Sequence, residues 1–269
     1  MANGSRRRRQ RKMESTAAVL NQRYGEQALR KASSLTEHTI PPHVSTGFPA
    51  LDAITGCQGI PLGEITLLSG ETSSGKLTLA YKTLMNAQRP ARVRKGTHAL
   101  VAIVDVSHTT DPDYIARAGV DLEHLLIARP RDGQEAVELL TDLVRTQDLR
   151  AVVVDSLVDL LVTPGAGRRL QAVLGQLRHQ LRSANCSLIF ANDINPPWQR
   201  WLNVDRDVVV RQHAALHIEM KHESWINLDH EMRGYRSVAR VLKSRWTRGF
   251  PTAPIEILFN GTIKARPTW

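Results

Sequence analysis

Residues 70–78, Gly-Glu-Thr-Ser-Ser-Gly-Lys-Leu-Thr, constrain the fold of this chain more than any other stretch. They follow an apolar run at 65–68 and precede a segment at 79–85 that can be helical. The spacing G-x-x-x-x-G-K is typical of a phosphate-binding loop, in which glycines let backbone N–H groups point at phosphate oxygens. Lys76 would reach the terminal phosphates. The sequence therefore predicts a nucleotide site between a strand and a helix.

The position after this lysine departs from the pattern. It normally carries a Ser or Thr hydroxyl that binds Mg²⁺, and here it is Leu77. Thr78 is a poor substitute, because one helical step turns its side chain about 100° away. The sequence therefore predicts that ATP is bound and is hydrolysed badly or not at all.

Charge and composition indicate the class of protein. The 269 residues are 42% hydrophobic, which is enough for one substantial core and an appendage. The net charge of +10 favours a polyanionic partner such as nucleic acid. Six of the basic residues fall within residues 6–12. Such a run is either a solvated, disordered tail, here residues 1–12, or a phosphate-binding segment.

The remaining features of composition indicate a cellular location. Cys57 and Cys186 form no disulfide framework and have no metal-ligand spacing, as in a reducing cytosol. No stretch approaches the roughly 18 apolar residues of a membrane span, and no apolar signal region follows the basic start. We expect a soluble, cytoplasmic protein without a membrane partner.

Apolar runs alternate with amphipathic segments through the middle of the chain. Strands are predicted at 65–68, 100–104, 151–154 and 187–190, with helices at 134–146 and 170–181 between them. This alternation predicts an α/β fold, a mainly parallel sheet with helices on both faces. Ligands of such sheets bind at the carboxyl ends of the strands, where Asp105, Asp155 and Asp193 lie.

The two ends of the chain have a different pattern. A helix is predicted at 14–31, and Pro41 and Pro42 mark a linker after it. Strands at 214–221, 236–246 and 254–259 have only polar turns between them and should extend the sheet in antiparallel fashion. The expected organisation is a disordered tail at 1–12, an N-terminal helix with a linker at 13–40, and a nucleotide-binding core at 41–269.

A longer stretch resembles the RecA family of recombinases. Residues 105–121 read Asp-Val-Ser-His-Thr-Thr-Asp-Pro-Asp-Tyr-Ile-Ala-Arg-Ala-Gly-Val-Asp, close to the family pattern D-x-E-H-x-x-D-P-x-Y…G-V-D, and the likeness continues to Pro130. Residues 153–157 resemble the family's Walker B strand, 188–193 its γ-phosphate sensor strand, and 240–250 its K-V-V-K-N-K…P-F segment. The resemblance covers 14–263 and leaves the family's C-terminal domain without a counterpart. It implies a RecA-like P-loop core with an N-terminal oligomerisation helix.

This resemblance implies an ATP site at a subunit interface. Tyr114 matches the residue that stacks on adenine, and Asp155 the acid that holds Mg²⁺ through water. Lys243 and Arg245 match residues that reach the neighbouring subunit's γ-phosphate, although they would otherwise be solvated charges on a strand. The implied nucleotide-binding set is Gly70, Glu71, Thr72, Ser73, Ser74, Gly75, Lys76, Leu77, Thr78, Asp111, Tyr114 and Asp155.

Three positions depart from the family's hydrolytic machinery. Besides Leu77, Ser107 stands where the family has its catalytic Glu, and Asp193 replaces a Gln that senses the γ-phosphate. Loss of a general base typically costs on the order of 10²–10⁴ in rate, and an ionised carboxylate would repel the phosphate. The sequence therefore assigns no catalytic residue, leaves open whether the chain is an enzyme, and predicts weak use of Mg²⁺.

The family's two DNA-binding loops also differ here. The first is reduced to 163–167, and the second, at 192–213, lacks the family's glycines and carries Trp and Arg instead. Aromatic rings interleaved with arginines suit stacking on single-stranded bases and pairing with phosphates. The alternative is that the two Trp pack against the core or a neighbouring subunit. The candidate DNA-binding residues are Arg168, Arg169, Trp198, Arg200, Trp201, Arg206 and Arg211.

Two functions follow from this resemblance. The first is a RecA-like protein of DNA repair and recombination, within the SOS response to DNA damage, that forms head-to-tail oligomers and binds single-stranded DNA. The second is a non-hydrolysing accessory factor that modulates a RecA filament or bridges RecA to a translesion polymerase, in the manner of ImuA proteins. A KaiC-like regulatory ATPase is disfavoured by the stretch at 105–130.

Overall fold

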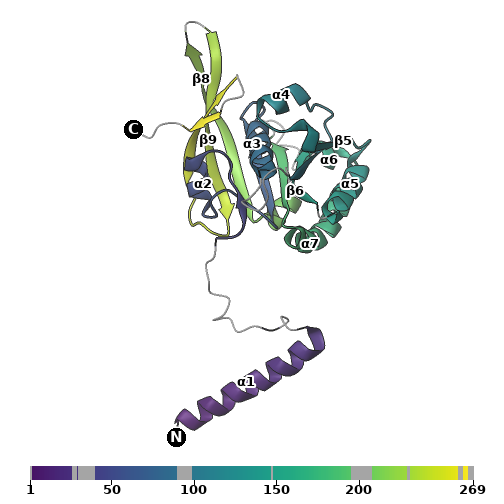
Figure 1. Cartoon of the computed structure of the whole chain (residues 1–269), viewed down its shortest axis with the longest axis vertical. Coiled ribbons are helices and arrows are strands. Elements are labelled where there is room, and N and C mark those ends of the chain that lie inside the picture. The colour runs from purple at the N-terminus through teal and green to yellow at the C-terminus, as the bar shows by residue number, and fades with distance from the viewer. Residues whose placement is uncertain are drawn as a thin grey trace. The chain divides into compact units, whose positions relative to one another are not determined.

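The computed structural model describes residues 2–25, 29, 40–89, 99–146, 148–194, 208–228, 231–259 and 263–265. The chain divides into two compact units, Met1–Thr39 and Ile40–Trp269. The first unit contains helix α1, and the second contains the sheet and all the other helices that Figure 1 labels. Among the described residues, no helix is long and apolar enough to cross a membrane.

Helix α1 (Ala2–Tyr24) begins before the basic run and continues through it. The predicted disorder at 1–12 and the predicted helix start at 14 are therefore wrong, and α1 ends at Tyr24. Arg, Lys, Gln and Met have high helix propensity, and no β-branched residue occurs before Thr16, so the basic run favours a helix. Residues 26–28 and 30–39, which include the rest of the predicted helix, lie outside the described residues.

The second unit is built on a nine-stranded sheet with the order β11-β10-β9-β8-β3-β7-β6-β4-β5. The strands from β8 to β5 in this order pair in parallel, and the β8–β9, β9–β10 and β10–β11 pairs are antiparallel. This arrangement confirms the predicted fold class. The strands are β3 (Ile65–Gly70), β4 (Leu100–Asp105), β5 (Leu125–Ala128), β6 (Leu149–Asp155), β7 (Ser187–Asp193), β8 (Leu216–Leu228), β9 (Glu231–Ser244), β10 (Thr252–Leu258) and β11 (Ile263–Ala265). Strands β1 (His43–Val44) and β2 (Ile60–Pro61) form a separate antiparallel pair.

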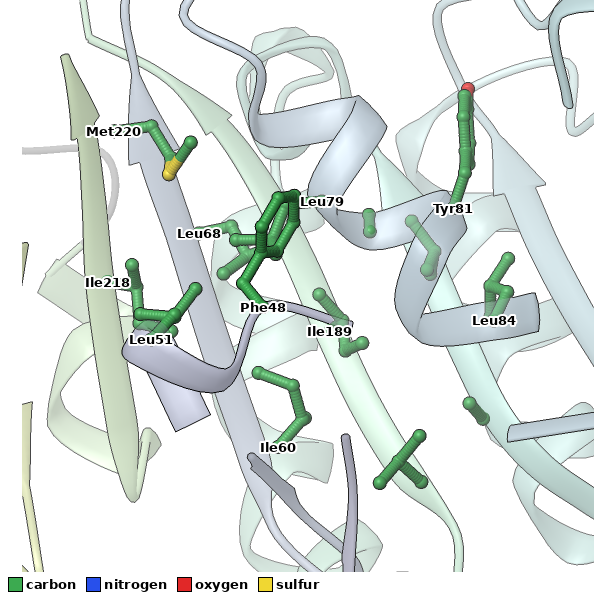
Figure 2. Packing of buried hydrophobic residues seen from close by; sticks show 14 of the residues in the cluster. Phe48, Leu51, Ile60, Leu68, Leu79, Tyr81, Leu84, Ile189, Ile218 and Met220 are labelled. Carbon is green, nitrogen blue, oxygen red and sulfur yellow. The ribbon is translucent and has the colours of Figure 1, made fainter. Parts of the chain in front are cut away.

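Helices cover both faces of this sheet, which explains why its central strands are apolar on both sides. Helices α2 (Pro49–Thr55), α3 (Lys76–Gln88) and α4 (Pro112–Arg117) contribute to one core cluster, in which Phe48 and Leu79 lie close to Leu68 and Ile189 (Figure 2). The other cluster contains side chains of α5 (Gly133–Arg145), α6 (Leu157–Val162), α7 (Ala166–Ala184) and α8 (Val208–His213). Complete burial of one leucine side chain stabilises the fold by about 1.5–3 kcal/mol.

The β8–β9 hairpin continues beyond the point where β3 ends. Pairing between β3 and β8 stops at Gly70 and Met220, but β8 runs on to Leu228 and still pairs with β9. Figure 1 shows this hairpin rising past the rest of the sheet. The hairpin therefore stands directly beside the loop that follows β3.

Candidate nucleotide-binding site

The phosphate-binding loop connects β3 to α3, and both of its glycines are required by their surroundings. Gly75 has φ +92°, a conformation that side chains other than glycine rarely adopt, and a Cβ there would lie 2.2 Å from Ile257 Cδ1. At Gly70 a Cβ would lie 2.4 Å from the carbonyl oxygen of Met220 on β8. The close approach of the β8 backbone thus explains Gly70, and the backbone conformation explains Gly75, independently of any ligand.

A cavity of about 620 Å³ lies over this loop. Thr72, Ser73, Gly75 and Lys76 line it from the loop and the start of α3. The carboxylates of Asp155, Asp159 and Asp193 also line it, and so do aromatic side chains. Among the described residues that line the cavity, Lys76 is the only base.

Lys76 is engaged by an internal carboxylate. Its Nζ lies 2.5 Å from Asp193 Oδ1 and 3.3 Å from the carbonyl oxygen of Glu71. The Lys76 side chain is 6% exposed and that of Asp193 is 37% exposed. Asp193 is held here by strand register, because it pairs with Gly70 across β3 and β7. The group that a P-loop offers to terminal phosphates is therefore already bound to an anion.

Asp155 ends β6 and is the most deeply buried carboxylate of the cavity, with 4% of the residue exposed. Burial, followed by the charges of Asp105 and Asp193, raises the pKa of Asp155 to about 6, against the smaller opposing effect of Lys76. Its buried Oδ2 atom has no hydrogen-bond partner among the residues that the structure describes. An ionised Asp155 would therefore be stabilised by a cation in this part of the cavity.

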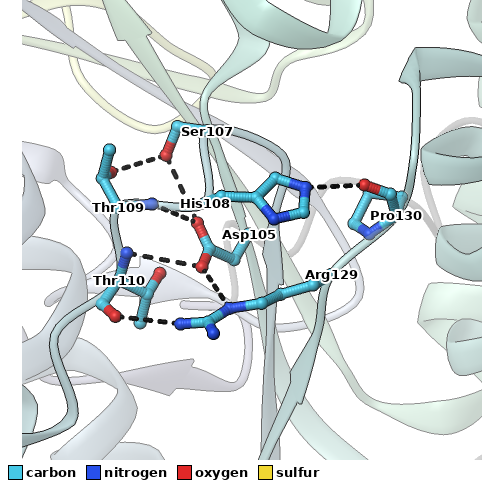
Figure 3. Close-up of polar contacts among 7 residues, drawn as sticks. All are labelled: Asp105, Ser107, His108, Thr109, Thr110, Arg129 and Pro130. Carbon is cyan, nitrogen blue, oxygen red and sulfur yellow. Dashed lines mark hydrogen bonds and ion pairs between the residues drawn. The ribbon is translucent and has the colours of Figure 1, made fainter.

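Asp105, at the end of β4, organises the segment that follows it (Figure 3). Its carboxylate accepts hydrogen bonds from the backbone of Thr109 at 3.1 Å and from Arg129 Nε at 3.0 Å. Ser107 Oγ donates to the same carboxylate at 3.3 Å and lies 2.6 Å from Thr109 Oγ1. Ser107 lines the cavity, so a hydroxyl occupies the position at which the resemblance implies a catalytic carboxylate.

An Mg²⁺ ion, which the resemblance implies, does not fit the side chains beside Lys76. Leu77 lines the cavity and has no ligand atom, and the Thr78 hydroxyl lies 2.5 Å from the Tyr114 hydroxyl. Among the described residues, no cluster of three or more His, Cys, Asp or Glu could hold a metal ion. Position 77, where a direct Mg²⁺ ligand would follow the lysine, therefore offers no side-chain oxygen, although the carboxylate of Asp155 lines the same cavity.

Three other residues of the predicted nucleotide-binding set differ in where they lie. The carboxylate of Asp111 caps α4, where it accepts a hydrogen bond from Asp113 N at 2.9 Å, and Asp111 is not among the residues that line the cavity. Tyr114 does line it, and its ring packs edge-on against Tyr81 at 6.0 Å between centroids. Glu71, also in the predicted set, is an exposed residue of the loop.

Three aromatic side chains that the sequence did not predict as site residues also line the cavity. Trp225 of β8, Tyr235 of β9 and Phe259 after β10 all line it. Trp225 and Tyr235 pair across the hairpin and meet edge-on at 5.8 Å, and Phe259 lies 6.3 Å from Tyr235. Trp225 is 46% exposed and Phe259 is 50% exposed. Trp225 and Tyr235 lie in the segment predicted as a polar turn between strands at 214–221 and 236–246, which the structure shows as the ends of β8 and β9, so no motif marks them in the sequence.

Lys243 and Arg245 lie near the opposite end of β3 from the loop. Arg245 donates to Glu64, the residue before β3, at 3.0 Å, and Lys243 Nζ donates to the carbonyl oxygen of Arg211 at 2.8 Å. Burial, together with Arg245 and Arg178, lowers the pKa of Lys243. Neither residue lines the cavity, so neither can contact a phosphate bound to its own loop.

The predicted DNA-binding residues are only partly described. Trp198, Arg200, Trp201 and Arg206 lie outside the described residues. Arg168 and Arg169 are exposed in the first turn of α7, where Arg169 pairs with Glu138, and Arg211 is exposed on α8. The shortened first loop is residues 163–165, because α7 already begins at Ala166.

Comparison with known proteins identifies the family. A model of the family described as the RecA N-terminal domain matches residues 11–264. Protein RecA of Sinorhizobium fredii (strain NBRC 101917 / NGR234) is 28% identical over 263 residues, which cover 92% of this chain and 71% of that protein. Protein RecA of Aquifex aeolicus (strain VF5) is 30% identical over 278 residues, covering 93% of this chain and 75% of that protein. These matches confirm the resemblance seen at 105–130, and the chain belongs to the RecA family.

Proposed function

We propose that this chain is a protein of DNA recombination or repair that binds ATP and single-stranded DNA and hydrolyses ATP weakly or not at all. The supporting observation is the cavity over the phosphate-binding loop, where Lys76 is retained while Leu77, Ser107 and Asp193 occupy the hydrolytic positions. Calorimetric titration and a phosphate-release assay on the same preparation test this proposal. Binding without measurable turnover is expected, and brisk magnesium-dependent turnover that Lys76→Ala abolishes would contradict it.

The aromatic part of the cavity supports a position for the base. Trp225 and Phe259 are about half exposed at the cavity, and Tyr114 lines it from α4. A purine needs flat apolar surface on its faces, and an exposed Trp ring provides more of it than any other side chain. The base is proposed to lie against these rings, with its phosphates directed toward Lys76.

Trp225→Ala is expected to weaken nucleotide binding by roughly 1–3 kcal/mol, because base–aromatic stacking is of this size. Trp225→Phe should retain most of the affinity. Fluorescence anisotropy of an N-methylanthraniloyl nucleotide gives the dissociation constants. Phe250→Ala is the matched control, since Phe250 is 61% exposed but does not line the cavity. Unchanged affinity in Trp225→Ala would exclude the ring as a base contact.

Binding of single-stranded DNA is proposed from charge and composition. The net charge of the chain is +10, and Arg168, Arg169 and Arg211 are exposed on α7 and α8. Trp198 and Trp201 alternate with arginines in the segment between β7 and α8. Stacking and phosphate contacts together predict affinity that tolerates changes of sequence and falls steeply with salt.

Trp198→Ala is expected to weaken binding to a single-stranded oligonucleotide by roughly 1–3 kcal/mol if its ring stacks on a base. Anisotropy titrations at several salt concentrations supply the affinities and the salt slope. Phe250→Ala should match the wild type in both quantities. Absence of binding at low salt, or a flat salt dependence, would remove single-stranded DNA from the proposal.

Self-assembly is proposed from the location of Lys243 and Arg245, which lie away from the chain's own loop and would serve a neighbouring copy. Head-to-tail contacts of this kind build rings or open helices. The ion pair between Lys76 and Asp193 favours a second candidate, a non-hydrolysing accessory factor that modulates a RecA filament or bridges it to a translesion polymerase. Electron microscopy with single-stranded DNA and a non-hydrolysable ATP analogue separates the two. Regular filaments of the purified protein favour the first, and co-purification with RecA without such filaments favours the second.

A further inference from the structure

We infer that the loop cavity binds nucleoside diphosphates in preference to triphosphates, and that Asp193 sets this preference. The inference rests on the proposed nucleotide binding and narrows its ligand class. In a P-loop the backbone amides cradle the inner phosphates, and the lysine extends toward the last two. A third phosphate would therefore approach Lys76 Nζ, which Asp193 Oδ1 already approaches to 2.5 Å.

Geometry keeps Asp193 in this position. It is the last residue of β7, paired with Gly70 in the parallel register of β3 and β7. The next residue, Ile194, donates its backbone N–H to the carbonyl oxygen of Gly70 at 3.0 Å. A terminal phosphate would have to separate Asp193 from Lys76 or share the lysine with it. A diphosphate brings only its β-phosphate to the lysine, so it meets less of this competition than a triphosphate does.

The net negative charge of the cavity lining also favours a diphosphate over a triphosphate. The described lining residues include three carboxylates, of Asp155, Asp159 and Asp193, and one base, Lys76. The three carboxylates line one cavity, so their negative charges repel one another. Each further phosphate brings negative charge into this group, and the direct Mg²⁺ ligand that would offset it is replaced by Leu77. A diphosphate carries less negative charge than a triphosphate, so the carboxylates repel it less.

Calorimetric titration of the full chain with ADP and with ATP, with and without Mg²⁺, tests the inference. The wild type is expected to bind ADP about tenfold or more tightly than ATP. Asp193→Asn should remove or reverse this ratio by strengthening ATP binding, while ADP affinity changes less than about threefold. Asp193→Ser serves the same purpose if the asparagine variant does not fold. Asp142→Asn is the matched control, because Asp142 is 73% exposed on α5 and remote in sequence from the loop.

The outcomes separate this inference from the function on which it rests. If the wild type binds ATP as tightly as ADP, or if the Asp193 variants leave the ratio unchanged, the diphosphate preference is wrong and nucleotide binding stands. If neither nucleotide binds to the wild type or to the Asp193 variants, the proposed nucleotide binding itself is wrong, and the preference falls with it.

Discussion

The triple variant Leu77→Thr/Ser107→Glu/Asp193→Gln is expected to hydrolyse ATP at least about 10²-fold faster than the wild type. Its three changes supply a hydroxyl for Mg²⁺, a carboxylate base and a neutral side chain near the terminal phosphate. A positioned general base alone typically contributes on the order of 10²–10⁴ in rate. Release of Lys76 from Asp193 frees a cation for the charge that develops on the phosphate. Steady-state phosphate release, at saturating ATP and Mg²⁺, measures the gain.

Single replacements should gain much less than the triple variant, because groups that act together in one site are not additive. Ser107→Glu alone would set a new carboxylate beside Asp105, to which Ser107 is hydrogen bonded, while Asp193 still holds the lysine. The control Leu77→Thr/Ser107→Gln/Asp193→Gln matches the triple variant in shape but lacks the base. If that control gains as much rate, the absence of a base at position 107 does not explain weak hydrolysis.

The parallel part of the sheet could be predicted because its strands carry their signal locally. Each of β3, β4, β6 and β7 is a buried run of apolar residues bounded by polar ones, and the structure confirms all four. Strand β5 has four residues at the sheet edge and is only partly buried, so it has neither the length nor the pattern that predicts a strand. Helices α2, α4, α6 and α8 are six or seven residues long, too short for helical periodicity to register.

The start of α1 was missed for a different reason. A dense basic run indicates disorder when charge repulsion is considered alone, but its residue types favour a helix. Only Ala17, Leu20 and Asn21 of the described α1 side chains are even partly buried. The helix is therefore stabilised by the intrinsic propensity of its residues, which a pattern of charge alone does not indicate.

Within the site, the phosphate-binding loop could be predicted from the sequence, but the residues that contact it from other strands could not. Glycines and lysine are close in sequence, and one motif contains them all. The ion pair joins residues 117 positions apart and depends on the register of β3 and β7. The aromatic part depends likewise on the pairing of Trp225 with Tyr235 across a hairpin. A single sequence specifies such registers through packing of the whole sheet, so no local pattern reveals them.

Acid should destabilise the fold through His217, which is 4% exposed between β3 and β9 with its Nε2 atom 2.7 Å from Ser69 Oγ. Burial, followed by the charges of Arg211 and Lys243, lowers the pKa of His217 from 6.5 to about 4. Between these two values the unfolded chain binds the proton and the folded chain does not, so stability rises with pH across this window. The contribution is fully present above pH 6.5, and roughly 3 kcal/mol of it is lost as the pH falls to 4.

Asp155 has the opposite dependence, so the wild type alone does not isolate the histidine. Its folded pKa of about 6 lies above the ordinary 3.8, and the stability linked to its protonation is lost as the pH rises through 6. His217→Gln keeps a partner for Ser69 and removes only the histidine titration. Urea unfolding between pH 4 and pH 7 should show that this variant loses roughly 3 kcal/mol less than the wild type on acidification. His179→Gln, at an exposed position of α7, should follow the wild type. Parallel curves for His217→Gln and the wild type would show that His217 accepts its proton without opening the fold.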